Sequence, residues 1–291
     1  ACYLIEQNGS AGIVETGTGN SLETILSVLK LKEIPVENVQ YVMPTHVHLD
    51  HAGGAGHLMQ HLPNAQLVIH PRGARHMVNP AKLWQGALAV YGEQAMQSMY
   101  GEIIPVDEDR TLVVEDGSTL DLNGRSLLFI DTPGHARHHY SVFDDQTRGF
   151  FTGDTFGMAY QELSSSHLPY IMPTTTPVQF DPEAWYQTLQ RYLEYKPERM
   201  FLTHYGMVEE VESLAADLQR RIECYVQIAE SCRGSNNRTE LMKSKIAEST
   251  FSELRKLNCP LPIPACKGLL AMDIELNVQG LEIWLDNKEG G

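Results

Sequence analysis

The feature that most constrains this chain is a histidine-rich segment that follows directly on a short apolar strand. The stretch VQYVM at 39–43 reads as a buried strand, and THVHLDHAGG follows it at 45–54. Polar side chains placed where a buried strand ends are typical of α/β proteins, whose sites gather at the carboxyl edge of a sheet. The two glycines at the end of the segment allow a tight bend into a following helix.

Within six positions this segment holds four side chains that can ligate a metal: His46, His48, Asp50 and His51. Side chains two apart in an extended segment point the same way, so His46 and His48 can bind one ion. Asp50 and His51 follow where the chain turns, and they can face a second ion. The density and order of these residues favour a metal site over a polar loop with incidental histidines.

Three further apolar strands are each followed by one residue that can ligate a metal, in the segments FIDTPGHARHH, FFTGDT and FLTHYG. These residues are His135, Asp154 and His204. Each is weak evidence alone, but with the first segment they make seven ligands, which is enough for two ions. All seven offer nitrogen or oxygen and none offers a thiolate, which suits zinc, iron or manganese.

Strands and helices alternate through the first half of the chain, and the second half is mostly helical. A hairpin is predicted at 2–17, around Asn8-Gly9, and a helix at 20–31. Further strands are predicted at 65–70, 112–122, 126–132, 148–154 and 199–204. Helices are predicted at 181–195, 210–232 and 238–257, and the stretch after 270 fits a helix or a strand. We therefore predict an α/β fold with a metal-binding domain at 1–207 and a helical region at 208–291.

The order HVHLDH, then His135, Asp154 and His204, resembles the metallo-β-lactamase superfamily and looks closest to its glyoxalase II-like hydrolases with a helical C-terminal part. The resemblance covers roughly residues 1–206. It implies a four-layer αββα sandwich, here with added C-terminal helices. It also implies the ligand roles: His46, His48 and His135 for the first metal, Asp50, His51 and His204 for the second, and Asp154 as the bridge.

The donor types and the resemblance together predict a dinuclear-metal hydrolase in which a metal-bound hydroxide attacks a thioester or an ester. Metal binding lowers the pKa of water from ~15.7 to about 7. Asp50 is the candidate catalytic residue, because its carboxylate can orient the nucleophile and pass a proton to the leaving group. Zinc is the expected metal, with iron or manganese left open. The alternatives are a lactonase, phosphodiesterase or β-lactamase on the same site, a di-iron protein that reacts with O₂ or NO, and a regulatory protein.

The chain departs from the resemblance after His135. Many glyoxalase II-like sequences repeat Pro-Gly-His at this point, whereas this chain has Ala136-Arg137-His138-His139. We expect His139 to pack behind a ligand, and His138 to lie at the surface or at the pocket rim. The basic residues that bind glutathione in glyoxalase II are not recognisable in the C-terminal part, so no particular substrate is carried over.

A long segment at 157–180 follows Asp154 and supplies candidate residues for a substrate pocket. Loops longer than ~12–15 residues are often functional in compact domains. The candidates are Tyr160, His167 and Tyr170 from this segment, and Tyr205 beside His204. The C-terminal helices either cover the substrate or form a homodimer interface, and the sequence leaves both open.

Charge and cysteine content exclude other classes of function. The chain has 22 Lys and Arg against 37 Asp and Glu, a formal net charge of −15, which disfavours nucleic-acid binding. Its 5 cysteines are odd in number and have no CxxC spacing, which favours free thiols and a cytoplasmic location. No apolar run approaches the ~20 residues of a membrane span. We therefore expect a small-molecule substrate and neither a nucleic-acid nor a membrane partner. Because the sequence begins at Ala1 in a strand, a lost leader is left open.

Overall fold

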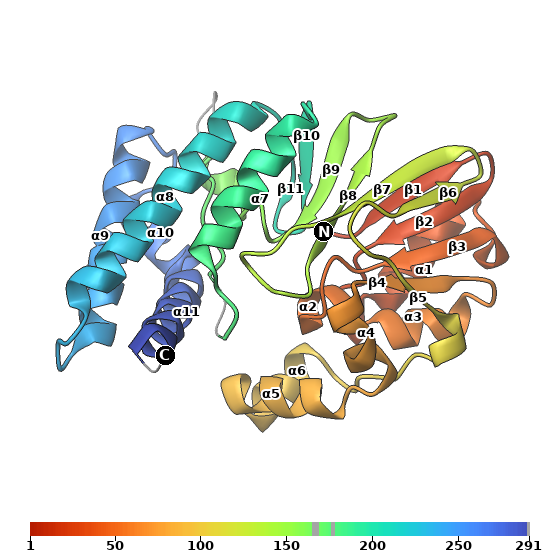
Figure 1. Ribbon diagram of the computed structural model, residues 1–291, viewed down its shortest axis with the longest axis horizontal. Helices are drawn as coiled ribbons and strands as arrows, with labels where there is room; N and C mark the ends of the chain where they lie inside the picture. The colour runs from red at the N-terminus through yellow and green to blue at the C-terminus, as the bar shows by residue number, and fades with distance from the viewer. Residues whose placement is uncertain (165–168, 176–177, 290–291) are drawn as a thin grey trace. The chain divides into compact units, whose positions relative to one another are not determined.

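The structure of the protein is a computed structural model, which describes residues 1–164, 169–175 and 178–289 (Figure 1). The chain folds into two compact units. The first unit comprises Ala1–Asp131 and His138–Gly153, and the second comprises Thr132–Arg137 and Asp154–Gly291. The chain therefore crosses from one unit to the other on both sides of the segment that carries His135, and again directly before Asp154.

The first sheet of the first unit has the strand order β1-β2-β3-β4-β5. Its strands are β1 (Tyr3–Gln7), β2 (Ser10–Val14), β3 (Val39–Met43), β4 (Gln66–Ile69) and β5 (Thr111–Val113). β1 and β2 are antiparallel and meet at the predicted turn, where Asn8 and Gly9 both have positive φ. From β2 to β5 the strands are parallel, so β2, β3 and β4 all end at one edge of the sheet.

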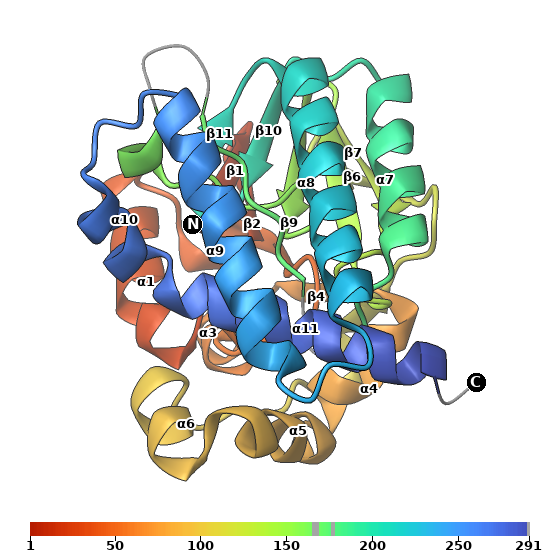
Figure 2. The ribbon, with the colours of Figure 1, turned by 90° about the vertical axis from the view of Figure 1, so that its left-hand side faces the viewer.

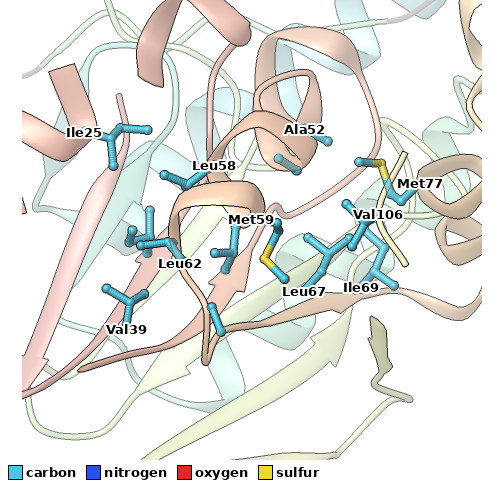
Figure 3. Close-up of a cluster of buried hydrophobic side chains, with 14 of the residues drawn as sticks. Ile25, Val39, Ala52, Leu58, Met59, Leu62, Leu67, Ile69, Met77 and Val106 are labelled. Atoms are coloured by element: carbon cyan, nitrogen blue, oxygen red, sulfur yellow. The ribbon is translucent and has the colours of Figure 1, made fainter. Parts of the chain in front are cut away.

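Helices pack on this sheet through apolar side chains (Figure 3). The helices of the first unit are α1 (Leu22–Leu31), α2 (Leu49–Ala52), α3 (Ala55–His61), α4 (Pro71–Val78), α5 (Ala81–Tyr91) and α6 (Glu93–Met99). Ile25 of α1 and Leu58 of α3 belong to one buried cluster with Val39 and Leu67 of the sheet. A smaller cluster joins Leu49, at the start of α2, to Met96 and Tyr100.

The second sheet of the first unit is antiparallel in the order β6 to β9. Its strands are β6 (Thr119–Leu122), β7 (Arg125–Asp131), β8 (Tyr140–Asp144) and β9 (Gly149–Gly153). The single strand predicted at 112–122 is wrong, because β5 and β6 belong to different sheets. A turn at Asp116-Gly117 divides them, and Gly117 has a φ of +78°, which favours glycine.

The second unit is mostly helical. It contains α7 (Pro182–Glu194), β10 (Arg199–Leu202), β11 (Gly206–Val208), α8 (Val211–Cys232), α9 (Arg238–Lys256), α10 (Ile263–Leu269) and α11 (Ala271–Glu289). Short 3₁₀ helices lie in the two units at Gly19–Ser21, Val36–Asn38, Glu108–Arg110 and Gln161–Leu163. α8, α9 and α11 pack against one another, and α11 crosses the other two (Figure 2). Asp181 caps α7, where its carboxylate accepts a hydrogen bond from the backbone N–H of Ala184 at 3.1 Å.

A buried arginine joins α8 to α9. Arg221 is 3% exposed, and its Nε donates to Oε2 of Glu253 at 2.7 Å. The Arg221 guanidinium also lies over the ring of Tyr170, 4.5 Å from its centroid. Burial raises the pKa of Glu253, but hydrogen bonds from Arg220 and Arg221 outweigh it and hold that pKa below its usual value.

The predicted α/β class is confirmed, with two sheets, accompanying helices and a helical C-terminal part. The stretch after 270 is the helix α11 and not a strand. Strands β8 and β11 were not predicted from the sequence. The predicted domain boundary at 207/208 stays a prediction. Among the described residues, no helix is long and apolar enough to cross a membrane.

Removing the carboxylate of Glu253 should destabilise the second unit. Glu253→Ala leaves the buried Arg221 guanidinium without its main partner, which typically costs about 3 kcal/mol of unfolding free energy. Glu230→Ala is the control, because Glu230 pairs with Lys288 and Arg233 at the surface, where such pairs contribute about 1 kcal/mol or less. Urea unfolding followed by circular dichroism measures both. Equal losses for the two variants would contradict this account.

Candidate metal centre

The ends of the parallel strands explain where the first predicted ligands lie. β2 ends before Glu15, and β3 ends before the segment of Thr45 and His46, at the same edge of the sheet. The peptide N–H of Glu15 donates to the carbonyl of Met43, and that of Thr16 donates to the carbonyl of His51. The histidine segment is thus fixed to the end of β2 by backbone hydrogen bonds.

Gly54 makes this close approach possible. A Cβ at this position would lie 2.7 Å from the carbonyl oxygen of Thr18 and 2.9 Å from that of Thr16. The peptide N–H of Gly54 donates to the carbonyl of Gly17 at 2.8 Å. This glycine was predicted to allow a tight bend. In the structure it also lets two backbone segments approach so closely that there is no room for a side chain.

The first unit brings four predicted ligands together: His46, His48, Asp50 and His51. His46 Nε2 lies 2.8 Å from His48 Nδ1, and the ring centroids of His46 and His51 are 4.0 Å apart. Oδ2 of Asp50 lies 3.3 Å from Nε2 of His51. His46 and His51 are fully buried, whereas the side chain of Asp50 is 43% exposed.

A buried carboxylate, which the sequence reasoning missed, holds two of these histidines. Glu15 is 0% exposed, and its Oε1 lies 3.0 Å from Nδ1 of His51. The same carboxylate accepts hydrogen bonds from the Thr45 hydroxyl at 2.5 Å and from the Thr45 peptide N–H at 3.1 Å. The Thr45 hydroxyl lies 3.1 Å from Nδ1 of His46. Both rings therefore have Nδ1 engaged, which is how metal-binding histidines are oriented so that Nε2 faces an ion.

His138 and His139 lie beside these ligands in the first unit. The ring of His139 is fully buried and stacks on that of His46, with centroids 4.9 Å apart. His138 is 6% exposed, and its ring centroid is 5.4 Å from that of His48. Of the two expected positions of His138, the surface is therefore wrong, because its ring is buried against two predicted ligands, and the pocket rim stays a prediction.

The second unit brings the other three predicted ligands together around one carboxylate. Oδ2 of Asp154 lies 3.5 Å from Nε2 of His135. Its other oxygen, Oδ1, lies 3.4 Å from Nε2 of His204. Asp154 thus presents one oxygen to each of the two histidines. His135 and Asp154 are buried, and the side chain of His204 is 25% exposed.

Thr174 holds two of these ligands and was also missed from the sequence. Its backbone carbonyl lies 2.6 Å from Nδ1 of His135, and its hydroxyl donates to the carbonyl of Asp154 at 2.8 Å. The tight turn before His135 depends on Gly134, which has a φ of +133° and where a Cβ would lie 2.5 Å from the Cβ of Trp185. The long segment after Asp154 therefore folds back on the ligands on either side of it.

The donor chemistry of both groups suits divalent ions. Imidazole nitrogen and carboxylate oxygen are ligands for zinc, iron and manganese, and every donor named above is of one of these kinds. Nδ1 of His46, His51 and His135 meets an oxygen of Thr45, Glu15 and Thr174, respectively, so Nε2 is the nitrogen that each ring could offer to an ion. The common seven-residue site stays a prediction.

The predicted pocket residues differ in how exposed they are to solvent. Tyr205 is 45% exposed and has a φ of +88°, a conformation that costs a bulky residue about 1–3 kcal/mol. Its ring packs on that of Tyr160, which is 8% exposed, with centroids 4.2 Å apart. Tyr170 is 2% exposed beneath Arg221. His167 lies outside the described residues. Their roles in substrate binding stay predictions.

The sequence of the chain matches known proteins over most of its length. Residues 1–204 match the family model of the metallo-beta-lactamase superfamily. The metallo-beta-lactamase fold-containing protein ST1585 of Sulfurisphaera tokodaii is 30% identical over 200 residues, which are 67% of this chain and 69% of that protein. The thioesterase pkgB of Emericella nidulans is 25% identical over 152 residues, 52% of this chain and 34% of that protein. The hydroxyacylglutathione hydrolase of Prochlorococcus marinus is 25% identical over 138 residues, 44% of each protein.

Solved structures of similar fold extend over nearly the whole chain. The crystal structure of archaeal ST1585 aligns with a TM-score of 0.64 and 24% identity, and covers 97% of this chain and 91% of that one. The metallo-beta-lactamase family protein TTHA1429 of Thermus thermophilus aligns with a TM-score of 0.69 and 17% identity, and covers 99% of this chain and 88% of that one. These likenesses show the fold class that the sequence predicted.

Glu15→Gln should weaken metal binding without unfolding the protein. Glutamine keeps the shape of the side chain but removes the charge that faces His51, and losses of such supporting partners typically reduce metal affinity about 10–100-fold. Competition for zinc against a chromogenic chelator measures the change. Glu23→Gln, at an exposed position of α1, is the control and should bind zinc like the parent protein. Unchanged affinity in folded Glu15→Gln would show that the carboxylate serves the fold alone.

Proposed function

The chain belongs to the metallo-β-lactamase superfamily, and on this premise we propose that it is a dinuclear-metal hydrolase of thioesters or esters. The observation that carries the proposal is the carboxylate of Asp154. Its two oxygens face Nε2 of two different histidines at 3.5 and 3.4 Å. This position between two histidines is where a carboxylate shared by two ions would lie.

We assign the ligands as the sequence implied. His46, His48 and His135 would hold the first ion, Asp50, His51 and His204 would hold the second, and Asp154 would be shared between them. Zinc is the proposed metal, and iron or manganese would suit the same donors. Two such ions would supply Lewis acidity and lower the pKa of water to about 7.

The protein side chains contribute orientation and proton transfer. Glu15 fixes Nδ1 of His51, and Thr174 fixes Nδ1 of His135, so each ring would keep its Nε2 available to a bound ion. Asp50 is half-exposed, so its carboxylate can reach solvent and substrate. We propose that it takes the proton of the attacking water and delivers it to the leaving group.

A thioester or ester substrate is supported by the chemistry of the site and by the relatives. Water is the attacking group in a dinuclear site of this kind, so the reaction requires no serine or cysteine nucleophile. One relative is named a thioesterase and another a hydroxyacylglutathione hydrolase. A net charge of −15 does not favour a polyanionic nucleic acid. Tyr160, Tyr205, Tyr170 and His167 are the proposed pocket residues, for a small-molecule substrate in the cytoplasm.

The test is metal content and hydrolysis measured on the same preparation. We expect about two zinc, iron or manganese ions per chain by elemental analysis, and hydrolysis of a thioester and ester panel that stops on chelation and returns with metal. Asp154→Asn should lose metal and reduce kcat/KM at least about a thousandfold, because the bridge loses its charge.

Asp145→Asn is the matched control. Asp145 is an exposed aspartate in the turn after β8, paired with Arg148 at 3.7 Å, and its loss should leave both readouts unchanged. Two bound iron ions without hydrolysis would favour the redox alternative. Folded protein that binds no metal after reconstitution would contradict the ligand assignment itself.

A further inference from the structure

Two cysteines of the second unit have their sulfur atoms in contact. Sγ of Cys259, in the connector between α9 and α10, lies 3.9 Å from Sγ of Cys266 in α10. The sulfurs of Cys224 and Cys232, by contrast, contact serine hydroxyls. A disulfide bond is about 2.05 Å long, and both thiols of the pair are free in this structure.

The backbone holds both members of the pair in place. α9 ends in a Schellman motif, in which the peptide N–H of Cys259 donates to the carbonyl of Leu254 at 2.9 Å. Asn258 precedes Cys259 with a φ of +53°, the left-handed conformation of this motif. The peptide N–H of Cys266 donates to the carbonyl of Pro262 at 3.1 Å, in the first turn of α10. The contact between the two sulfurs is therefore imposed by hydrogen-bonded backbone on both sides.

The two thiols differ in their access to solvent and in how readily they ionise. Cys259 is partly exposed, whereas Cys266 is fully buried. Sγ of Cys266 also lies 3.6 Å from the carbonyl oxygen of Leu261, to which its S–H can donate. Burial raises the pKa of Cys266, and the neighbouring Cys259 raises it further. Because peroxides react with thiolates that they can reach, Cys259 is the thiol that reacts first.

We propose that Cys259 and Cys266 form a reversible disulfide when the protein meets a peroxide, with Cys259 as the attacking thiol and Cys266 as the resolving thiol. The thiolate of Cys259 attacks one oxygen of hydrogen peroxide and becomes a sulfenic acid. The O–O bond breaks, and the other oxygen leaves as water with the proton that the thiol gave up. This inference is independent of the metal centre.

The second step closes the disulfide. The sulfur of Cys266 attacks the sulfenic sulfur of Cys259, so that an S–S bond forms and the S–O bond breaks. The hydroxide leaves as water with the proton of Cys266. Two thiols and one peroxide thus give one disulfide and two waters, and a dithiol reductant reverses the reaction by thiol exchange.

The bond would join the end of α9 to α10, directly before α11. The carbonyl of Cys266 accepts a hydrogen bond from the peptide N–H of Leu270, and the carbonyl of Leu270 accepts one from Ile274 in α11, both at 3.0 Å. Asp273, which accepts the hydroxyl proton of Tyr160, lies in this first turn of α11. The disulfide would therefore restrain the end of α11 that contacts Tyr160.

Peptide mapping of peroxide-treated protein tests the inference. Trypsin cleaves after Lys256 and Lys267, so both cysteines fall in the single peptide 257–267. After treatment of the folded protein with hydrogen peroxide, this peptide should be about 2 Da lighter than the dithiol form and should resist alkylation. Dithiothreitol should restore two thiols that can be alkylated. A peptide that keeps both thiols, or that gains oxygen without forming the disulfide, would overturn the inference.

Cys224 and Cys232 provide a matched control in the same digest. They share the tryptic peptide 222–233 and both lie on α8, where eight residues span about 12 Å along the helix axis. This separation is too long for a disulfide in the folded protein, so their peptide should keep both thiols. An equal loss of about 2 Da from both peptides would show that an unfolded chain is oxidised, and it would overturn the inference.

Single variants distinguish the attacking thiol from the resolving one. In Cys266→Ala the sulfenic acid of Cys259 meets no resolving thiol, so dimedone, which labels sulfenic acids, should label Cys259 after peroxide treatment. In Cys259→Ala the buried Cys266 should stay unlabelled. Circular dichroism checks that each variant is folded, and the mapping of the parent protein does not depend on either. Label on Cys266 in folded Cys259→Ala, or none on Cys259 in folded Cys266→Ala, would overturn the assignment.

The restraint on the helices is measured by thermal unfolding. Closing a short loop removes freedom from the unfolded chain, so the oxidised parent protein should have a Tm about 4 °C higher, and dithiothreitol should reverse the rise. Cys259→Ala should show no rise after the same treatment. An unchanged Tm of fully oxidised protein would contradict the restraint on α11.

Discussion

The buried carboxylate of Glu15 is the interaction on which the first group of ligands depends. A carboxylate with no solvent exposure must be matched by donors, and Glu15 finds them in the hydroxyl and peptide N–H of Thr45 and in the ring of His51. These partners join the end of β2 to the segment after β3. Glu15 and Thr45 are 30 residues apart in the sequence, but they can form a hydrogen bond because adjacent parallel strands end at the same edge of the sheet.

The close packing of the predicted ligands lowers the free energy of unfolding. The ring centroids of His48 and His51 lie 4.4 and 4.0 Å from that of His46, and a nitrogen of His46 faces a nitrogen of His48 at 2.8 Å. Buried polar atoms brought together in this way need a proton or an ion between them. The left-handed backbones of Glu15 and Tyr205 add strain at both groups of ligands. Such local cost, concentrated at the predicted ligands, is expected of a functional site and not of a packed core.

Each predicted ligand is marked locally in the sequence, by an apolar strand that is followed by a histidine or an aspartate, and its ligand role stays a prediction. Supporting residues carry no such mark. Glu15 also follows a strand, but a single glutamate after GIV reads as solvated until the neighbouring strand is known. Thr174 acts through its carbonyl, which any residue could offer. The division of 112–122 between two sheets was missed for a related reason, since a short turn at Asp116-Gly117 looks like part of a continuous extended stretch.

The C-terminal helix α11 explains why the helical region is more than an addition to the metal site. Asp273 and Asn277 lie one turn apart on the same face of this helix. Asp273 accepts from Tyr160, and Asn277 accepts hydrogen bonds from the peptide N–H and the hydroxyl of Thr175. Thr175 adjoins Thr174, whose two oxygens meet His135 and Asp154. The helix thus supports the segment that orients two predicted ligands and, through Tyr160, the exposed tyrosine beside a third. A substitution in α11 can therefore shift this segment without contacting a predicted ligand.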